Sequence, residues 1–146
     1  AFPLESGFVD IGSGKGKPLI IAAEYGFHPV VGVELVESLC AVARANIERL
    51  GLAEKVRVEC TNGVDYSFGR ERVVFLNNPF DAEFLSTMVR RLTEAMAGSD
   101  RPAWVLYGNP TWRHVFEDHP NWAERRYFSF RGPGRDIAVY EYVSAA

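Results

Sequence analysis

A cluster of three glycines near the N-terminus is the part of the sequence best suited to bind a ligand. Gly12, Gly14 and Gly16 follow the short apolar run 8–11 and precede a segment whose apolar residues have helical spacing. Glycine has no Cβ, so the backbone of such a loop can approach a bound molecule closely. In open α/β sheets, ligands bind beyond the carboxyl ends of the strands. The cluster therefore predicts a small-molecule site built largely from main-chain atoms.

The spacing of these glycines distinguishes among three kinds of ligand. A phosphate-binding P-loop needs Ser or Thr after its Gly-Lys pair, but Pro18 follows Lys17. A dinucleotide fingerprint needs a third glycine where Lys17 stands, and that side chain would crowd the helix–strand contact. The third pattern is an acid, then alternating glycines, then an acid at the end of the next strand. It fits Asp10, the three glycines and Glu34.

This third pattern resembles that of the class I S-adenosylmethionine-dependent methyltransferases. VDIGSGKGK is similar to their first motif and VVGVELVESLC to their second, and the resemblance runs from about Phe8 to Val143. It implies S-adenosylmethionine as the cofactor and methyl transfer as the activity. Two alternatives stay open, a non-catalytic S-adenosylmethionine-binding module of a larger protein and an NAD-binding oxidoreductase domain.

The resemblance also implies how each part of the cofactor is held. Glu34 would accept hydrogen bonds from both ribose hydroxyls, because a carboxylate has two acceptor oxygens. Gly12 and Gly14 would line the methionine part with backbone, and Asp10 would face the ammonium group directly or through water.

The adenine ring would be held by residues that follow two different strands. Leu35 would cover one face of the ring. Asn62 would accept a hydrogen bond from the adenine amino group, at a position where the family often has an acid. The predicted cofactor-binding residues are therefore Asp10, Gly12, Ser13, Gly14, Gly16, Glu34, Leu35, Asn62 and Gly63.

The run Asn77-Asn78-Pro79-Phe80 is the second candidate chemical site. It resembles the Asn/Asp-Pro-Pro-Phe/Tyr motif of family members that methylate amino nitrogens, with Asn78 where the first proline would be. In an alternative register, Asn78-Pro79-Phe80 is the functional Asn-Pro-Phe triplet and Asn77 still belongs to the strand. In that fold the motif ends the fourth strand beside the transferable methyl group. An asparagine carbonyl can hold the N–H groups of an amine, proline keeps the backbone rigid, and phenylalanine can pack on a cationic group. We therefore expect these four residues to be catalytic, acting on a protein lysine or a small amine.

Other residue patterns argue against metal and disulfide chemistry. His114 and His119 are five positions apart, whereas a helical metal pair needs four, and Pro120 follows at once. Cys40 and Cys60 are twenty positions apart, which is no metal-type spacing. We therefore expect no bound metal and two thiols in a reducing cytoplasm.

Composition narrows the possible partners. The chain of 146 residues has 16 Lys+Arg and 19 Asp+Glu, a net charge of −3, so nucleic acid is a less expected acceptor. Nothing approaches the roughly 20 apolar residues of a membrane span, and the N-terminus AFPLESG lacks a secretory signal. We expect a cytoplasmic protein with no membrane partner. The oligomeric state stays open.

Strand-like and helix-like segments alternate along the chain. Apolar runs predict strands at 8–11, 29–33, 55–60, 72–76 and 103–107. Helical spacing predicts helices at 17–25, 36–50 and 81–97 and a short one from residue 111. The aromatic segments 126–130 and 137–143 predict an antiparallel hairpin. The fold expected is α/β, a doubly wound, mainly parallel, seven-stranded Rossmann-like methyltransferase sheet with that C-terminal hairpin.

Several packing and domain expectations complete the interpretation. Residues 1–146 are expected to form one methyltransferase-like domain that lacks the family's helices upstream of the first strand. The hairpin aromatics are expected in its core and edge, and Trp112 and Trp122 are expected to flank the short helix and line a cleft. The apolar face expected on the helix at 36–50 comprises Leu39, Val42, Ala43, Ile47 and Leu50.

Overall fold

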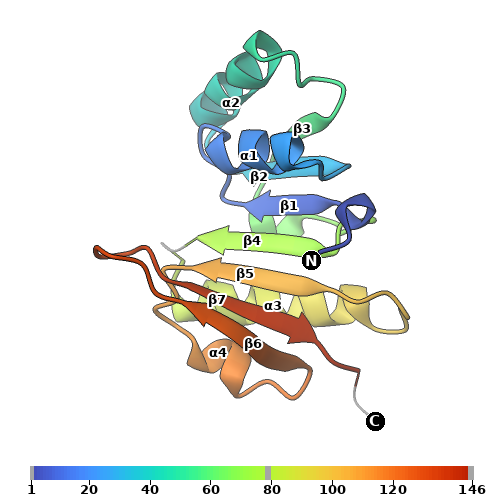
Figure 1. The fold of residues 1–146 in the computed structure, drawn as a ribbon, viewed down its shortest axis with the longest axis vertical. Coiled ribbons are helices and arrows are strands. Elements are labelled where there is room, and N and C mark those ends of the chain that lie inside the picture. The colour runs from blue at the N-terminus through green and yellow to red at the C-terminus, as the bar shows by residue number, and fades with distance from the viewer. Residues whose placement is uncertain (1, 78–79, 145–146) are drawn as a thin grey trace. The chain divides into compact units, whose positions relative to one another are not determined.

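The computed structural model describes residues 2–77 and 80–144. Its elements along the chain are η1 (Leu4–Ser6), β1 (Phe8–Ile11), α1 (Lys17–Tyr25), β2 (Val30–Glu34), α2 (Glu37–Arg49), β3 (Val56–Cys60), η2 (Gly63–Asp65), β4 (Val73–Asn77), α3 (Ala82–Met96), β5 (Trp104–Gly108), α4 (His114–Glu117), β6 (Trp122–Phe128) and β7 (Ile137–Tyr142) (Figure 1).

The strands form a seven-stranded mixed sheet with the order β3-β2-β1-β4-β5-β7-β6. The β1–β2 and β2–β3 pairs are parallel, and the β5–β7 and β6–β7 pairs are antiparallel. The expected α/β class and closing hairpin are therefore confirmed. Contacts divide the chain between Val74 and Phe75 into two compact units, which are described separately below. The expectation of a single methyltransferase-like domain stays a prediction.

The first unit is built on strands whose carboxyl ends meet at one edge. Every residue of β1 and β2 is buried, as is typical of parallel strands covered on both faces. The register sets Asp10 opposite Gly32 and Glu34 opposite Cys60. Because the three strands are parallel, the residues that follow each of them lie at the same edge of the sheet.

Two helices pack against these strands. α1 begins after Gly16, has Pro18 in its first turn and ends at Gly26, as expected. It packs against β1 and β2, and α2 packs against β2 and β3.

The expected apolar face of α2 is partly wrong. Its buried residues are Cys40, Ala43 and Ile47, whereas Val42 and Leu50 are exposed. Cys40, Ala43 and Ile47 are three and four positions apart, so they form one face of the helix, and packing against the sheet buries this face.

The second unit combines β5, β7 and β6 with α3 and α4. Asp81 accepts a hydrogen bond from the Phe84 amide at 2.7 Å, so the expected N-cap of α3 is confirmed. Leu85, Met88 and Leu92 are fully buried on the inner face of this helix, which covers strands β5 and β7 (Figure 1).

Trp122 is a core residue, so the expectation that it lines a cleft is wrong. It begins β6, is 4% exposed, and donates from Nε1 to Thr93 Oγ1 at 2.9 Å. Its ring also meets Phe116 of α4 edge-on at 5.9 Å. The strand therefore begins four residues before the expected position, and its first side chain joins α3 to α4.

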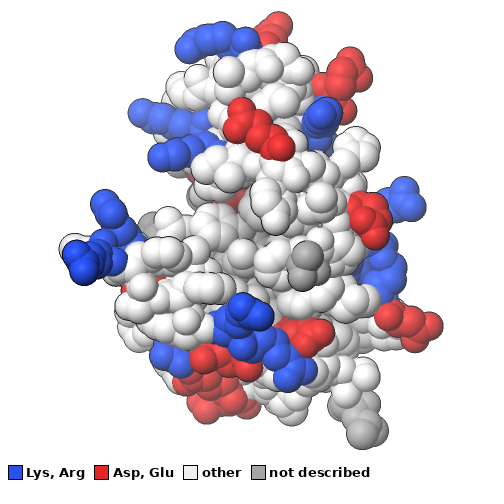
Figure 2. All heavy atoms as spheres, in the orientation of Figure 1, with Lys and Arg blue, Asp and Glu red and all other residues white. Residues whose placement is uncertain are grey.

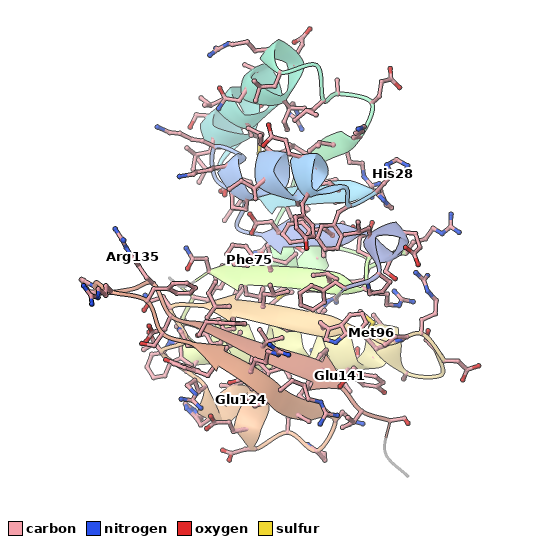
Figure 3. The ribbon with its side chains drawn as sticks, in the orientation of Figure 1. His28, Phe75, Met96, Glu124, Arg135 and Glu141 are labelled. Carbon is pink, nitrogen blue, oxygen red and sulfur yellow. The ribbon has the colours of Figure 1, made fainter. Side chains whose placement is uncertain are left out.

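The hairpin aromatics are only partly in the core. Tyr140 is fully buried, but Tyr127, Phe128 and Phe130 are exposed. β6 is the last strand in the sheet order, and its register with β7 shifts between Glu124 and Arg126. After that shift its side chains are solvated on both faces, and in the turn that follows, Arg135 points away from the strands (Figure 3).

Helix length, possible metal ligands and surface charge add three further observations. Among the described residues, no helix combines the length and apolar character needed to cross a bilayer. No cluster of three metal-type ligands occurs in residues 2–77 and 80–144. On the face drawn in Figure 2, basic and acidic side chains are interspersed.

Candidate cofactor site

The glycine loop is folded back onto the end of β2. The amides of Gly12 and Ser13 both donate to the Val33 carbonyl, at 2.8 and 3.0 Å. Gly12, Gly14 and Gly16 all have left-handed φ angles, of 86°, 54° and 87°. Residues other than glycine rarely adopt this backbone conformation, so the three glycines allow the loop to turn sharply between β1 and α1.

The glycines differ in what surrounds them. A Cβ added at Gly14 would meet no atom within 4 Å, so the space beside it is open to a ligand. A Cβ added at Gly16 would lie 3.3 Å from the Ala43 Cβ, so this glycine allows close packing of the loop on α2. The predicted residue Ser13 is buried, and its Oγ faces Gly32.

Glu34 is the carboxylate that organises the loop. Its Oε2 accepts from the Gly14 amide and its Oε1 accepts from the Val36 amide, both at 2.9 Å. The residue is 8% exposed, so it is buried but still reaches the surface. A carboxylate oxygen can accept more than one hydrogen bond, so both oxygens retain capacity for hydroxyl donors.

Asp10 is the second buried carboxyl group of this site, and it lies beside Glu34. The residue is 1% exposed, and neither carboxyl oxygen has a hydrogen-bond partner in the described part of the chain. Burial, with a further contribution from the Glu34 charge, raises the pKa of Asp10 to about 8. The group is therefore mostly neutral at pH 7, and it can accept a donor that the described residues do not supply.

The residues predicted to hold the adenine ring of the cofactor lie around the ends of β2 and β3. Leu35 is 65% exposed, as expected of a side chain that would cover a ligand. Asn62 Oδ1 accepts from the Val64 amide at 3.2 Å and caps η2, which begins at Gly63. The Thr61 amide donates to the Glu34 carbonyl at 3.0 Å, which joins the two strand ends. Asn62 therefore has a structural role, and its oxygen keeps a second lone pair for a ligand.

The second candidate site lies in the other unit and is described in part. Asn77 ends β4 and is exposed, and the Phe80 ring stacks on Phe84 with centroids 4.5 Å apart. Trp112 Nε1 donates to the Phe80 carbonyl at 3.0 Å, a contact that helps to fix Phe80, and the expectation that Trp112 lines a cleft stays a prediction. Asn78 and Pro79 lie outside the described residues.

Gly108 lies beside the candidate residue Asn77, a neighbour that sequence reasoning missed. A Cβ added there would lie 2.9 Å from Asn77 Oδ1, so the absence of a side chain at Gly108 lets the Asn77 amide lie against this end of β5. The signal available was a glycine at the end of a predicted strand, before the Asn109-Pro110 turn.

A family model described as a methyltransferase domain matches residues 9–97, which is more than half of the chain. The chain belongs to this methyltransferase domain family. The match covers the glycine loop, both buried carboxyl groups and the adenine end described above. The expected class of protein is therefore confirmed, and S-adenosylmethionine is the cofactor of the family.

Individual relatives agree with this assignment. The ribosomal protein L11 methyltransferase of Pelotomaculum thermopropionicum is 32% identical over 97 residues, which cover 66% of this chain. Those residues are 30% of the relative, so this methyltransferase domain spans only part of its length.

Two solved structures share the fold. The magnesium protoporphyrin IX methyltransferase of Synechocystis with bound S-adenosylmethionine has a TM-score of 0.70 at 18% identity, covering 94% of this chain and 69% of that one. An RNA methyltransferase of Salinibacter ruber in complex with S-adenosyl-L-homocysteine has a TM-score of 0.68 at 22% identity, covering 95% and 82%. The expected Rossmann-like methyltransferase fold is confirmed. These relatives carry names of different acceptors, so the acceptor stays open.

The residues of the first unit fit the cofactor of this family. The Asp10 carboxyl, which has no hydrogen-bond partner among the described residues, suits an ammonium group. The open space at Gly14 suits a close main-chain contact, and the Glu34 carboxylate, which is buried but reaches the surface, suits sugar hydroxyls.

Proposed function

We propose that this domain binds S-adenosylmethionine at the loop after β1 and transfers its methyl group to an amino nitrogen of a protein lysine or a small amine. The observation that carries the cofactor assignment is the pair of buried carboxyl groups. Glu34 is fixed by two backbone amides, whereas Asp10 has no partner among the described residues. Glu34 can therefore accept hydrogen bonds from hydroxyl groups, and Asp10 can pair with a cation.

Five of the predicted cofactor residues then have a defined task. Glu34 accepts the ribose hydroxyls, Asp10 accepts the ammonium group, and the Gly12 and Gly14 backbone lies along the methionine part. Leu35 covers the adenine ring, and its exposure is consistent with this role. The bound group would supply a methyl on a positively charged sulfur, and in-line attack by an amine lone pair on the methyl carbon would break the C–S bond and release the sulfur as a neutral thioether.

The residues at the end of β4 are proposed to position the acceptor. The Asn77 carbonyl oxygen accepts an N–H of the amine, which aims the nitrogen lone pair at the methyl group. Such positioning supplies much of the acceleration in transfer reactions. Asn78 and Pro79 are proposed to shape the same binding edge, and Phe80, which is held by Trp112 and Phe84, packs against the acceptor.

Binding of S-adenosylhomocysteine by the domain tests the first half of the proposal. Calorimetry is expected to show binding that Glu34→Gln weakens by about 10- to 100-fold, because charged hydrogen bonds contribute about 1.5–3 kcal/mol. Glu37→Gln is the matched control, since it removes the same charge from an exposed residue three positions away. Binding of NAD in place of S-adenosylhomocysteine, or equal affinities of the two variants, would contradict the assignment.

Transfer of labelled methyl to a panel of peptides and small amines tests the second half. Asn77→Ala is expected to lower the transfer rate while leaving S-adenosylhomocysteine affinity unchanged. Transfer only to RNA, or to hydroxyl acceptors, would show that the amino-nitrogen assignment is wrong. Tight cofactor binding with no transfer to any acceptor would instead favour a non-catalytic binding module.

A further inference from the structure

The two cysteines of the chain lie against each other beside the proposed cofactor site. Cys40 is in the first turns of α2, and Cys60 ends β3 directly opposite Glu34. The two Sγ atoms are 2.7 Å apart, although the residues are twenty positions apart in the sequence. Both thiols are free. The fold therefore brings together a pair of thiols that the spacing does not predict.

The two thiols differ in their access to solvent. Cys60 is exposed, whereas Cys40 is fully buried. Burial and the hydrogen bond with Cys60 raise the pKa of Cys40 to about 11, so Cys40 stays protonated at neutral pH. An oxidant in solution can reach Cys60 first, and the only thiol placed to react next is Cys40.

Both thiols also contact the backbone that carries the proposed ribose and adenine residues. Cys40 Sγ lies 3.3 Å from the Glu34 carbonyl oxygen, and Cys60 Sγ lies 4.0 Å from the Leu35 carbonyl oxygen. The Cys40 S–H can thus donate to Glu34 or to Cys60. Replacing the two S–H groups by a covalent bond would remove these donors and tie the start of α2 to the end of β3.

We propose that Cys40 and Cys60 are a reversible disulfide site, and that a peroxide closes it and thereby weakens cofactor binding. The Cys60 thiolate attacks one peroxide oxygen, the O–O bond breaks, and the leaving hydroxide takes a proton to become water. The resulting Cys60 sulfenic acid is attacked by the Cys40 sulfur, the S–O bond breaks, and a second water leaves with the Cys40 proton. Two thiols are oxidised to one disulfide and one peroxide is reduced. A dithiol reductant reverses the change by exchange.

Intact-mass analysis after hydrogen peroxide treatment tests the bridge itself. The wild-type chain is expected to lose the mass of two hydrogen atoms, to stay monomeric on a non-reducing gel and to regain the lost mass with dithiothreitol. Cys40→Ser is expected to stop at a sulfenic acid that dimedone traps, and Cys60→Ser to resist oxidation because Cys40 is buried. Stable sulfenic acid in the wild type, or disulfides formed only between chains, would overturn the proposal.

Calorimetry with S-adenosylhomocysteine tests the consequence for binding, which rests on the proposed cofactor site. Oxidation is expected to weaken binding about fivefold, the loss typical of one hydrogen bond, and dithiothreitol is expected to restore it. Cys60→Ser treated with peroxide in the same way is the control and is expected to show no change. Unchanged affinity in a fully bridged chain would refute the coupling. Absence of binding in the reduced chain would refute the proposed cofactor site, while the mass readout would still decide the bridge.

Discussion

Asp10 provides the most direct test of how the proposed site receives its ligand. With a pKa raised to about 8, roughly nine in ten Asp10 side chains are protonated at pH 7 in the free protein. An ammonium group placed against this carboxyl favours its charged form. Binding of S-adenosylhomocysteine at pH 7 is therefore expected to release about 0.9 proton per site if Asp10 ionises fully.

Calorimetry in buffers with different ionisation enthalpies measures this release. The observed binding enthalpy is expected to depend linearly on the buffer ionisation enthalpy, with a slope that reports the protons released. The release is expected to fall toward zero as the pH rises past 9, because Asp10 is then already ionised in the free protein. Asp10→Asn is the control, because any proton exchange by the ligand's own amino group persists in that variant.

The same pKa predicts how the stability of the free protein depends on pH. The folded-state pKa lies above the ordinary value of 3.8, so between about pH 4 and 8 the folded state binds one more proton than the unfolded state. The contribution of Asp10 to the free energy of unfolding is therefore greatest at low pH and falls by up to about 1.4 kcal/mol per pH unit across this range. Asp10→Asn is expected to remove this slope in chemical denaturation. Identical slopes and identical proton release in the two proteins would refute a buried neutral carboxyl.

Two further predictions concern the scaffold. Gly32→Ala is expected to lower the free energy of unfolding by about 1–3 kcal/mol in urea denaturation, because its Cβ would overlap Leu19 and come within 2.7 Å of Ser13 Oγ; an unchanged midpoint would show that the loop yields easily. Trp122→Phe is expected to lower the free energy of unfolding by about 1–3 kcal/mol, because it leaves Thr93 Oγ1 without the indole donor. Trp104→Phe, at a less buried position, is the comparison. Equal losses of stability in the two variants would contradict a special role for the Trp122 contact.

The local features of the fold were predictable because each depends on a few adjacent residues. The glycine loop needs left-handed backbone, and Gly12, Gly14 and Gly16 supply it. Asp81 caps α3 through its own turn, and Gly26 ends α1 in the same local way. Such signals are read directly from residue types and spacing.

Features that depend on neighbouring elements were not predictable. The buried face of α2 is decided by the sheet beneath it, so helical spacing alone placed Val42 and Leu50 wrongly. Trp122 belongs to the core because α3 and α4 both reach it. The approach of Cys40 to Cys60 depends on the register of β2 with β3, which no spacing along the chain reveals.

The candidate site shows the same division between residue identity and environment. Sequence reasoning identified Asp10 and Glu34 as candidate cofactor-binding residues, but it did not predict how strongly their surroundings differ. Glu34 receives two backbone N–H donors, which stabilise a carboxylate, whereas Asp10 receives none and is buried next to that negative charge. Burial and the neighbouring Glu34 charge both raise the pKa of Asp10, so Asp10 is mostly neutral at pH 7 in the free protein. A cation at Asp10 removes the reason for its neutrality, so the proposed site favours a ligand that carries an ammonium group in addition to its sugar hydroxyls. Neutral adenosine is therefore expected to bind far more weakly than S-adenosylhomocysteine and to release no proton at pH 7.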